Sequence, residues 1–291
     1  MSGGPRLDAL EVRRTLRREG LRASHARSQN FLADPEVLQA ILDLAEVAKG
    51  MRVLEIGPGL GILTGGLLAG GARVTAIELD RGLAAYLRGQ LGDAIAEGRL
   101  DLIEGDALDQ ALPDLLPPPY RVVANIPYHI TSPILHRFLE RAPRPERLVL
   151  MVQAEVADRL AAKPGDMSYL AVFAQYHAAV RVALRVPPEA FEPAPKVASA
   201  VVVIEPRATS ALDFADEQRL WGLVQAGFRE RRKMLRNVLG RQLHAGPDGA
   251  SGPFVGQARV DAALAAAGIA GDRRPQTLGV DDWIRLLGVL S

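Results

Sequence analysis

The sequence predicts an α/β fold in which a doubly wound, mostly parallel seven-stranded sheet is followed by a smaller all-α C-terminal domain. Three features support this prediction. Apolar, strand-like segments alternate with segments of helical period between about residues 53 and 152, a glycine-rich turn follows the first of these strands, and the pattern becomes helical after residue 206. We therefore expect two domains, residues 1–206 and residues 207–291.

Each element has a local signal. Strands are expected where apolar and β-branched residues run between turn residues, and helices where apolar residues recur with helical period. Asp34 followed by Pro35 is a typical helix start. The expected strands are 53–56, 73–78, 100–104, 121–124, 148–152, 180–186 and 197–204. The expected helices are 8–19, 35–50, 60–68, 83–91, 131–140, 168–176, 220–228, 262–267 and 283–290.

The turn after the first strand is where a binding site is expected. Gly57, Gly59 and Gly61 alternate there, and glycines allow backbone angles that other residues avoid and leave no Cβ between main chain and ligand. The first turn of the following helix points free N–H groups into the same space. The spacing differs from the dinucleotide fingerprint, because Ile62 stands where the third glycine would be. From this stretch alone, a turn without a ligand remains an alternative.

Composition excludes several classes of protein. No apolar run of about 18 residues is present, so no membrane span is expected, and the N-terminus lacks the apolar core of a secretion signal. The 291 residues contain no cysteine, which excludes disulfides and thiolate metal sites and is compatible with a reducing cytoplasm. The net charge is only +1, but basic residues gather at positions 6–27 and 229–236, as a solvated face or as a surface for phosphates.

Four expected strands end in residues that suit a ligand. In parallel, doubly wound sheets ligands bind beyond the carboxyl ends of the strands, so we expect Gly57, Glu78, Asp106 and Asn125 to meet at one crevice. Glu78 is either an acceptor for ribose hydroxyls or simply an exposed acid. Asp106, which precedes Ala107, is either a turn residue or an acceptor for the amino group of an adenine.

The segment Asn125-Ile126-Pro127-Tyr128 is the most specific signal for chemistry. Pro127 has no N–H and holds Ile126 extended, so this turn presents carbonyls and the amide oxygen of Asn125 as acceptors. Two such acceptors on the N–H groups of adenine N6 would favour a pyramidal amine whose lone pair can attack without a strong base. Tyr128 offers a face on which a flipped base can stack. Phe191 is a candidate for the opposite face, with core packing as the alternative.

Metal and hydrolase chemistry are not expected. The histidines are scattered without the spacing of metal ligands. Ser132 and His136 lie one turn apart on the expected helix 131–140, but the sequence places no acid to complete a triad.

Eight segments, in order and spacing, resemble the S-adenosylmethionine-dependent ribosomal RNA adenine N6,N6-dimethyltransferases. The segments are Gln29–Leu32, Glu55–Gly61, Glu78, Gly105–Ala107, Asn125–Tyr128, Met167–Leu170, Phe191–Val197 and Arg231–Arg236. The resemblance spans about residues 25–290 and is closest to the bacterial members that act on small-subunit (16S) rRNA. Two departures are small: Ser28 stands where the family commonly has Gly, and Met234 where it commonly has Thr.

The resemblance implies a Rossmann-like S-adenosylmethionine methyltransferase domain with an N-terminal basic extension at 1–206, and a helical RNA-binding domain at 207–291. The implied cofactor is S-adenosyl-L-methionine, and the implied cofactor-binding residues are Gln29, Asn30, Leu32, Gly57, Gly59, Glu78, Asp106, Ala107 and Asn125. The implied catalytic residues are Asn125, Pro127, Tyr128 and Phe191, with the two aromatic rings on either side of the target base. The implied RNA contacts are Arg229, Arg231, Arg232, Lys233 and Arg236.

The implied function is dimethylation of N6 of two adjacent adenosines near the 3′ end of 16S rRNA, as part of ribosome biogenesis. The expected partner is 16S rRNA within the small (30S) ribosomal subunit, and we expect a cytoplasmic monomer with neither membrane nor metal. Two alternatives remain open: a 23S rRNA adenine N6-methyltransferase of the macrolide-resistance type, and an rRNA-binding assembly factor whose methylation is incidental. The glycine spacing and Asn125–Tyr128 disfavour a nicotinamide-dependent oxidoreductase.

Overall fold

The computed structural model describes residues 8–23, 29–110, 116–127, 130–140, 142–242 and 256–290. The chain divides into two compact units, Met1–Ala157 with Ala178–Pro206, and Asp158–His177 with Arg207–Ser291. One division between the two units follows Pro206. The predicted domains, residues 1–206 and 207–291, stay a prediction. Residues 158–177, which the sequence pattern assigns to the first domain, belong to the second unit because the aromatic side chains of one helix in this segment pack on the helices after residue 206.

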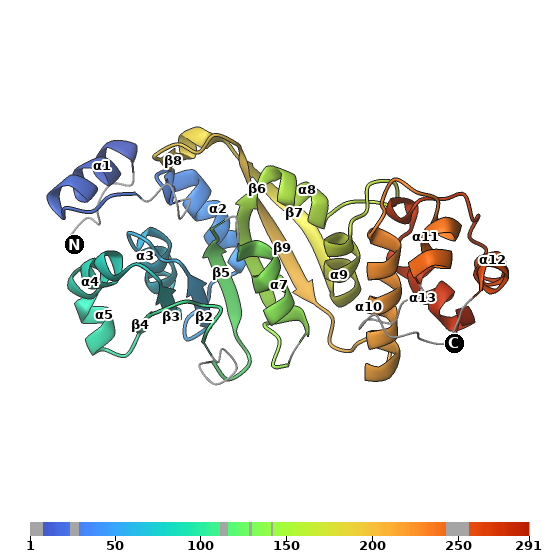
Figure 1. The fold of residues 1–291 in the computed structure, drawn as a ribbon. Helices are drawn as coiled ribbons and strands as arrows, with labels where there is room; N and C mark the ends of the chain where they lie inside the picture. Colours follow the sequence, from blue (N-terminus) through green and yellow to red (C-terminus); the bar gives the residue numbers. More distant parts are fainter. Residues whose placement is uncertain are drawn as a thin grey trace. The chain divides into compact units, whose positions relative to one another are not determined.

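The first unit is built on a seven-stranded sheet of order β4–β3–β2–β5–β6–β9–β7 (Figure 1). Its strands are β2 (Arg52–Ile56), β3 (Arg73–Glu78), β4 (Leu100–Glu104), β5 (Arg121–Asn125), β6 (Arg147–Gln153), β7 (Ala178–Val186) and β9 (Ser199–Pro206). Neighbours from β4 to β6 pair in parallel, and β9 pairs antiparallel with both β6 and β7. The predicted mostly parallel sheet is thus confirmed. The strand order reverses between β2 and β5, which is where such sheets open a crevice.

Both faces of the sheet are buried. Successive residues of a strand point to opposite faces, and Val122 and Val123 of β5 are both fully buried. Val123 packs in a cluster with Ile41 of α2 (Pro35–Ala45) and Leu67 of α3 (Ile62–Ala69). Burial on both faces explains why the strands read as continuous apolar runs. Among the described residues up to 160, the other helices are α1 (Ala9–Arg18), α4 (Arg81–Gln90), α5 (Gly92–Ala96), α7 (Thr131–Glu140) and α8 (Ala154–Leu160).

Helix α2 begins as predicted but ends early. The Asp34 carboxylate accepts hydrogen bonds from the N–H groups of the first helical turn, at 2.8 and 3.1 Å. The prediction that this helix continues to residue 50 is wrong, because the helix ends at Ala45 and Glu46 adopts a left-handed φ of 48°. Arg121 of β5 donates hydrogen bonds to the carbonyls of Ala45 and Glu46, and a hydrogen bond from Arg147 lowers the pKa of the Glu46 carboxyl. Contacts to the sheet therefore set the end of the helix.

A two-stranded antiparallel ribbon, absent from the predicted elements, joins the N-terminal arm to the loop after β7. Its strands are β1 (Phe31–Leu32) and β8 (Phe191–Glu192). Leu32 pairs with Phe191 across the ribbon. Arg13 of α1 forms an ion pair with Glu192 at 2.8 Å, which ties the N-terminal helix to β8.

The second unit is helical. Its longer helices are α9 (Tyr169–His177), α10 (Phe214–Phe228), α11 (Leu235–Gln242), α12 (Gln257–Ala266) and α13 (Val280–Leu290), and the sequence pattern predicts all of these except α11. The rings of Tyr176 and His177 lie 5.1 and 5.6 Å from that of Trp221. Trp283 lies so close to Gly227 that an added Cβ would come within 2.4 Å of the indole. Among the described residues, no helix has both the length and the apolar character needed to cross a bilayer.

Candidate active site

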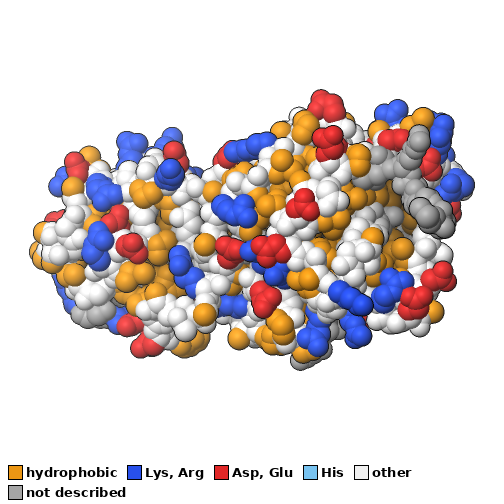
Figure 2. Space-filling view, turned by 180° about the vertical axis from the view of Figure 1, so that it is seen from behind, with side chains coloured by type: hydrophobic (Ala, Val, Ile, Leu, Met, Phe, Trp, Pro, Cys, Tyr) orange, Lys and Arg blue, Asp and Glu red, His pale blue; other side chains and the backbone are white. Residues whose placement is uncertain are grey.

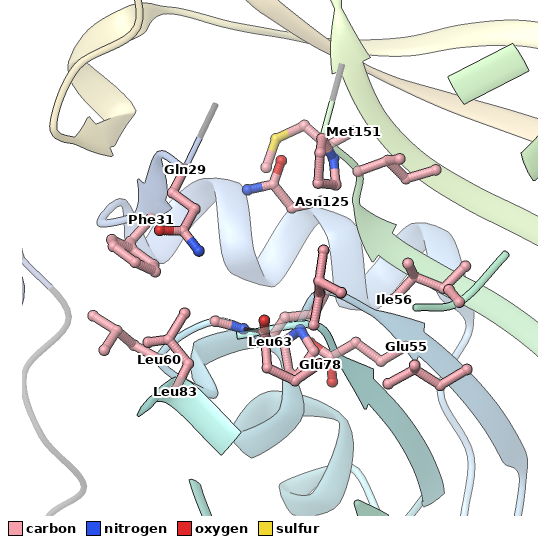
Figure 3. Close-up of a pocket in the computed structure, with 18 of the residues that line it drawn as sticks. Gln29, Phe31, Glu55, Ile56, Leu60, Leu63, Glu78, Leu83, Asn125 and Met151 are labelled. Carbon is pink, nitrogen blue, oxygen red and sulfur yellow. Dashed lines mark hydrogen bonds between the residues drawn. The ribbon is translucent and has the colours of Figure 1, made fainter. Parts of the chain in front are cut away.

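The carboxyl ends of β2, β3, β4 and β5 surround one pocket in the first unit (Figure 3). The predicted site residues that line it are Gln29, Asn30, Leu32, Gly57, Gly59, Glu78, Asp106, Ala107, Asn125 and Pro127. The predicted meeting of four strand ends at one crevice is therefore confirmed. Of the other predicted residues of this site, Phe191 is not part of the pocket wall, and Tyr128 lies outside the described residues.

The turn between β2 and α3 needs its glycines for the backbone itself. Gly57, Gly59 and Gly61 have φ angles of 69°, 60° and 77°, where other residues are strained. A Cβ on Gly59 would lie 3.1 Å from the ring of Phe31, and one on Gly61 would lie 2.6 Å from Leu87. The turn is therefore closely packed, and its main chain faces the pocket without side chains in between.

Glu78 at the end of β3 organises this turn. Its carboxylate accepts hydrogen bonds from the N–H groups of Gly59 (3.0 Å) and Asp80 (2.8 Å), and the residue is only 4% exposed. An ionised carboxylate offers roughly four acceptor positions, so these bonds leave capacity for a ribose hydroxyl. The alternative of an exposed acid is wrong, and the ribose contact stays a prediction.

Asp106 and Ala107 form the wall beyond β4. The Asp106 carboxylate accepts a hydrogen bond from the N–H of Leu108 at 2.8 Å, as acids in turns commonly do. The N–H of Gly105 donates to the carbonyl of Glu78 at 2.9 Å, which fixes this turn against the end of β3. Asp106 thus shapes a turn and also lines the pocket, and its contact with an adenine stays a prediction.

Asn125 ends β5 on the side of the cavity opposite Glu78 (Figure 3). Its Nδ2 donates to the main-chain carbonyl of Asn30 at 3.2 Å, and this bond leaves the amide Oδ1 as the atom that can accept from a ligand. The carbonyl of Pro127 accepts from the N–H of Ile130 at 3.1 Å and retains a second lone pair. Both groups therefore keep an acceptor, and their binding of a target amine stays a prediction.

Phe191 belongs to the hydrophobic core. It is only 2% exposed and packs in the same cluster as Leu32 and Ile41. The core-packing alternative therefore describes its position in this structure. Stacking of Phe191 on a target base stays a prediction, and it requires the ring to leave this cluster.

The pocket wall also contains residues that were not among the predicted site residues, including Phe31, Glu55 and Met151. Glu55 is 1% exposed, and its Oε2 has no hydrogen-bond partner among the described residues. Burial raises the pKa of Glu55 to about 8, against the opposing effect of hydrogen bonding by Thr64. The signal in the sequence was a single carboxylate inside an apolar strand, because such a group needs a partner or a ligand.

The predicted RNA-contacting cations belong to the second unit and do not line this pocket. Arg231, Arg232 and Lys233 are exposed on the turn between α10 and α11, and none of these three side chains has a hydrogen-bond or ion-pair partner within the part of the chain that the structure describes. Arg229 instead donates to Gln242 at 2.8 Å. Figure 2 shows basic and acidic side chains interspersed over the visible face, as the small net charge implies. Their binding to RNA stays a prediction.

These features define a class of protein. A glycine turn after β2, acidic groups beyond β3 and β4, and the strand order of this sheet fit a ligand that contains a nucleoside. The Oε2 of Glu55 is buried without a hydrogen-bond partner among the described residues, so a polar group of a ligand could pair with it. Strand β9 lies between β6 and β7 and runs antiparallel to both. Together with the parallel strands, this architecture is that of a Rossmann-like methyltransferase.

Comparison with known sequences identifies the family. The model of the family described as ribosomal RNA adenine dimethylase matches residues 21–257. A relative named ribosomal RNA small subunit methyltransferase A, from Anaeromyxobacter sp. (strain K), is 44% identical and aligns over 94% of this chain and 95% of its own. A relative of the same name from Geobacter metallireducens is 41% identical and aligns over 93% of this chain and 96% of its own. The chain therefore belongs to the ribosomal RNA adenine dimethylase family, whose members are methyltransferases.

Solved structures agree with this assignment. The crystal structure of the 23S rRNA methyltransferase ErmE superposes with a TM-score of 0.70 at 31% identity, over 90% of this chain and 99% of that one. The crystal structure of a dimethyladenosine transferase from Plasmodium falciparum superposes with a TM-score of 0.73 at 28% identity, over 88% of this chain and 95% of that one. The predicted fold class and methyltransferase activity are confirmed.

We expect Glu55→Gln to remove a pH-dependent loss of stability. Because the pKa of Glu55 is about 8 in the folded chain, above the usual 4.5 of a glutamic acid, the unfolded chain ionises this group first as the pH rises. Stability from Glu55 is therefore fully present below about pH 4.5 and is lost as the pH rises toward 8. Across this window, the free energy of unfolding of the variant should rise relative to that of the parent by roughly 1.4 kcal/mol per pH unit, measured by urea denaturation.

The exposed carboxylate of Glu36 provides the matched control for this measurement, and Glu36→Gln should track the parent at every pH. A stability difference between Glu55→Gln and the parent that stays constant from about pH 5 to pH 8 would contradict the raised pKa.

Proposed function

We propose that this protein uses S-adenosyl-L-methionine to dimethylate N6 of two adjacent adenosines near the 3′ end of 16S rRNA in the small (30S) ribosomal subunit, as a step of ribosome biogenesis. The observation that carries the proposal is the amide of Asn125, which is fixed by Asn30 so that Oδ1 remains to accept from an amino group in the pocket. The names of relatives at 44% and 41% identity support the choice of the small subunit.

Cofactor binding is assigned to the walls of the pocket already described. Gly57 and Gly59 would hold the amino-acid end, Glu78 the ribose, and Asp106 with Ala107 the adenine. Gln29, Asn30 and Leu32 would close the site from the N-terminal arm, next to the β1–β8 ribbon. When bound, S-adenosyl-L-methionine supplies an electrophilic methyl group on a sulfonium.

The protein's contribution to the reaction is alignment. Oδ1 of Asn125 and a main-chain carbonyl near Pro127 would accept the two N–H bonds of the target amine, which leaves its lone pair free to attack. With the cofactor bound, this lone pair would take its methyl group, the electron pair of the broken bond would stay with the cofactor, and the surplus N6 proton would pass to water. Alignment of this kind can contribute about 7–11 kcal/mol in favourable cases. Tyr128 and Phe191 would stack on the two faces of the target base.

RNA binding is assigned to exposed cations. Arg231, Arg232 and Lys233 have no partner among the described residues and would contact backbone phosphates, with Arg229 and Arg236 beside them in sequence. We place the protein in the cytoplasm as a monomer that binds 16S rRNA in the assembling subunit. The 23S rRNA alternative is kept as the second candidate, because ErmE has a similar structure at 31% identity.

The proposed function is tested with labelled S-adenosyl-L-methionine and unmethylated small subunits, large subunits or bare rRNA. We expect two dimethylated adenosines near the 3′ end of 16S rRNA in the small subunit, located by mass spectrometry of RNA fragments. Label in large-subunit rRNA alone would overturn the assignment, and binding of small subunits without label would favour an assembly factor.

Asn125→Ala should lower the rate of methyl transfer by at least about a hundredfold, the scale of losing one aligned polar group at a reacting centre. Subunit binding, measured by sedimentation with small subunits, should be largely retained. Gln39→Ala removes an exposed amide of the same unit and should leave both unchanged. Equal loss of transfer and binding in Asn125→Ala would contradict its role in aligning the amine.

The double variant Arg231→Ala/Arg232→Ala should weaken subunit binding and lower the slope of log affinity against log salt by about one for each cation removed. The rate at saturating subunit should stay close to that of the parent, because these residues are not assigned to the pocket. Arg219→Ala is the control, since its guanidinium already pairs with Asp216 at 3.0 Å. An unchanged salt slope in the double variant would exclude these two phosphate contacts.

A further inference from the structure

Met151 stands beside Asn125 in the wall of the pocket. It lies in β6, the neighbour of β5, and the two residues are Cα partners in this parallel pair, so their side chains leave the sheet on the same face. Both line the pocket, and Figure 3 shows the thioether of Met151 on the same side of the cavity as the Asn125 amide. Met151 is 1% exposed and is the one sulfur-containing side chain among the described residues of the wall.

The surroundings of Asn125 are otherwise stiff. The amide itself is held by the carbonyl of Asn30. Ile126 is β-branched and 1% exposed, and Pro127 has a closed ring. The backbone of Met151 is fixed, because its carbonyl accepts from the N–H of Ile126 at 3.1 Å and the strand pairs with β5 and β9 on either side. The unbranched side chain of Met151 is therefore the part of this wall that can change shape.

A second methyl transfer makes a demand that the first does not. Before the first transfer, both positions beside the target nitrogen hold N–H groups that face acceptors. Before the second, one of these positions holds a methyl group, which cannot donate to an acceptor and needs more room. A wall shaped only for the first substrate would stop the reaction at the monomethylated base.

We propose that Met151 is the specificity-determining residue for the number of methyl groups: its side chain moves aside to admit the monomethylated amine next to Asn125. The inference rests on the proposed function and deepens it. In each round the N6 lone pair forms the N–C bond, the methyl–sulfur bond breaks with its electron pair left on sulfur, and one N6 proton passes to water. After two rounds the nitrogen carries two methyl groups and no proton.

The test replaces the flexible side chain of Met151 by stiffer ones that are also apolar and of similar size. Met151→Ile introduces a β-branched, stiff side chain, and Met151→Leu is a milder change of the same kind. Single-turnover methylation of small subunits, followed by nucleoside mass spectrometry, gives the rates of the first and second transfers separately. In Met151→Ile we expect the second rate to fall by about tenfold or more while the first changes by less than about threefold, so that N6-methyladenosine accumulates. Met151→Leu should fall between this variant and the parent.

Met167→Ile is the matched control, because Met167 is also fully buried but lies outside the pocket and in the second unit. It should leave the ratio of the two rates unchanged. Thermal unfolding and calorimetric titration with S-adenosyl-L-methionine check that the variants fold and bind cofactor. As a readout other than activity, Met151→Ile should bind subunits with premethylated target adenosines more weakly than unmodified ones, whereas the parent should bind both alike.

The outcomes separate this inference from the proposed function. Equal loss of both transfer rates in Met151→Ile, or an unchanged ratio in all variants, would overturn the role of Met151 while leaving the dimethyltransferase assignment intact. Failure of the parent protein to methylate small subunits would instead overturn the proposed function. If Met151→Ile does not fold, the ratio measured in Met151→Leu decides the question in the same way.

Discussion

Parallel pairing of β3, β2, β5 and β6 is the constraint on which the site depends. Hydrogen bonding continues beyond the strands: the N–H of Gly57 donates to Ile77 at 2.9 Å, that of Gly105 to Glu78 at 2.9 Å, and that of Ile126 to Met151 at 3.1 Å. Buried backbone groups need such partners, so each loop is held where it leaves the sheet. The residues that follow the strands are therefore placed by main-chain bonds before any ligand arrives.

The polar side chains of the pocket each have a structural task and spare capacity. Glu78 holds the glycine turn, and the amide of Asn125 holds the N-terminal arm through Asn30, yet both keep acceptor atoms at the cavity. Bonds to the chain itself restrict the orientation of these groups, which reduces the ordering that a ligand must supply. Glu55 differs, because its Oε2 is buried without a partner among the described residues and burial raises the pKa of its carboxyl to about 8.

Binding of RNA and alignment of its target are assigned to different parts of the chain. The pocket wall is mostly apolar and lies in the first unit, whereas the exposed turn from Arg231 to Lys233 belongs to the second. Because the net charge is only +1, the total number of cations does not favour RNA binding. Affinity for RNA therefore depends on cations whose side chains are exposed and have no partner among the described residues. On α1, Arg13 is engaged with Glu192, whereas the cations of the α10–α11 turn have no such partner among the described residues.

The sequence by itself determined the parallel sheet, most strand bounds and the meeting of Gly57, Glu78, Asp106 and Asn125, because these follow from local patterns and from the geometry of parallel strands. Only the tertiary structure decided the features that depend on contacts between distant segments. The end of α2 at Ala45 is set by contacts with Arg121, and the β1–β8 ribbon joins residues far apart in sequence. Burial of Phe191 depends on a core cluster that includes Leu32 and Ile41, and composition could not settle it. Met151 was recognised as part of the site only through its pairing with Asn125, because the local pattern of each strand does not show which residue of its neighbour it faces.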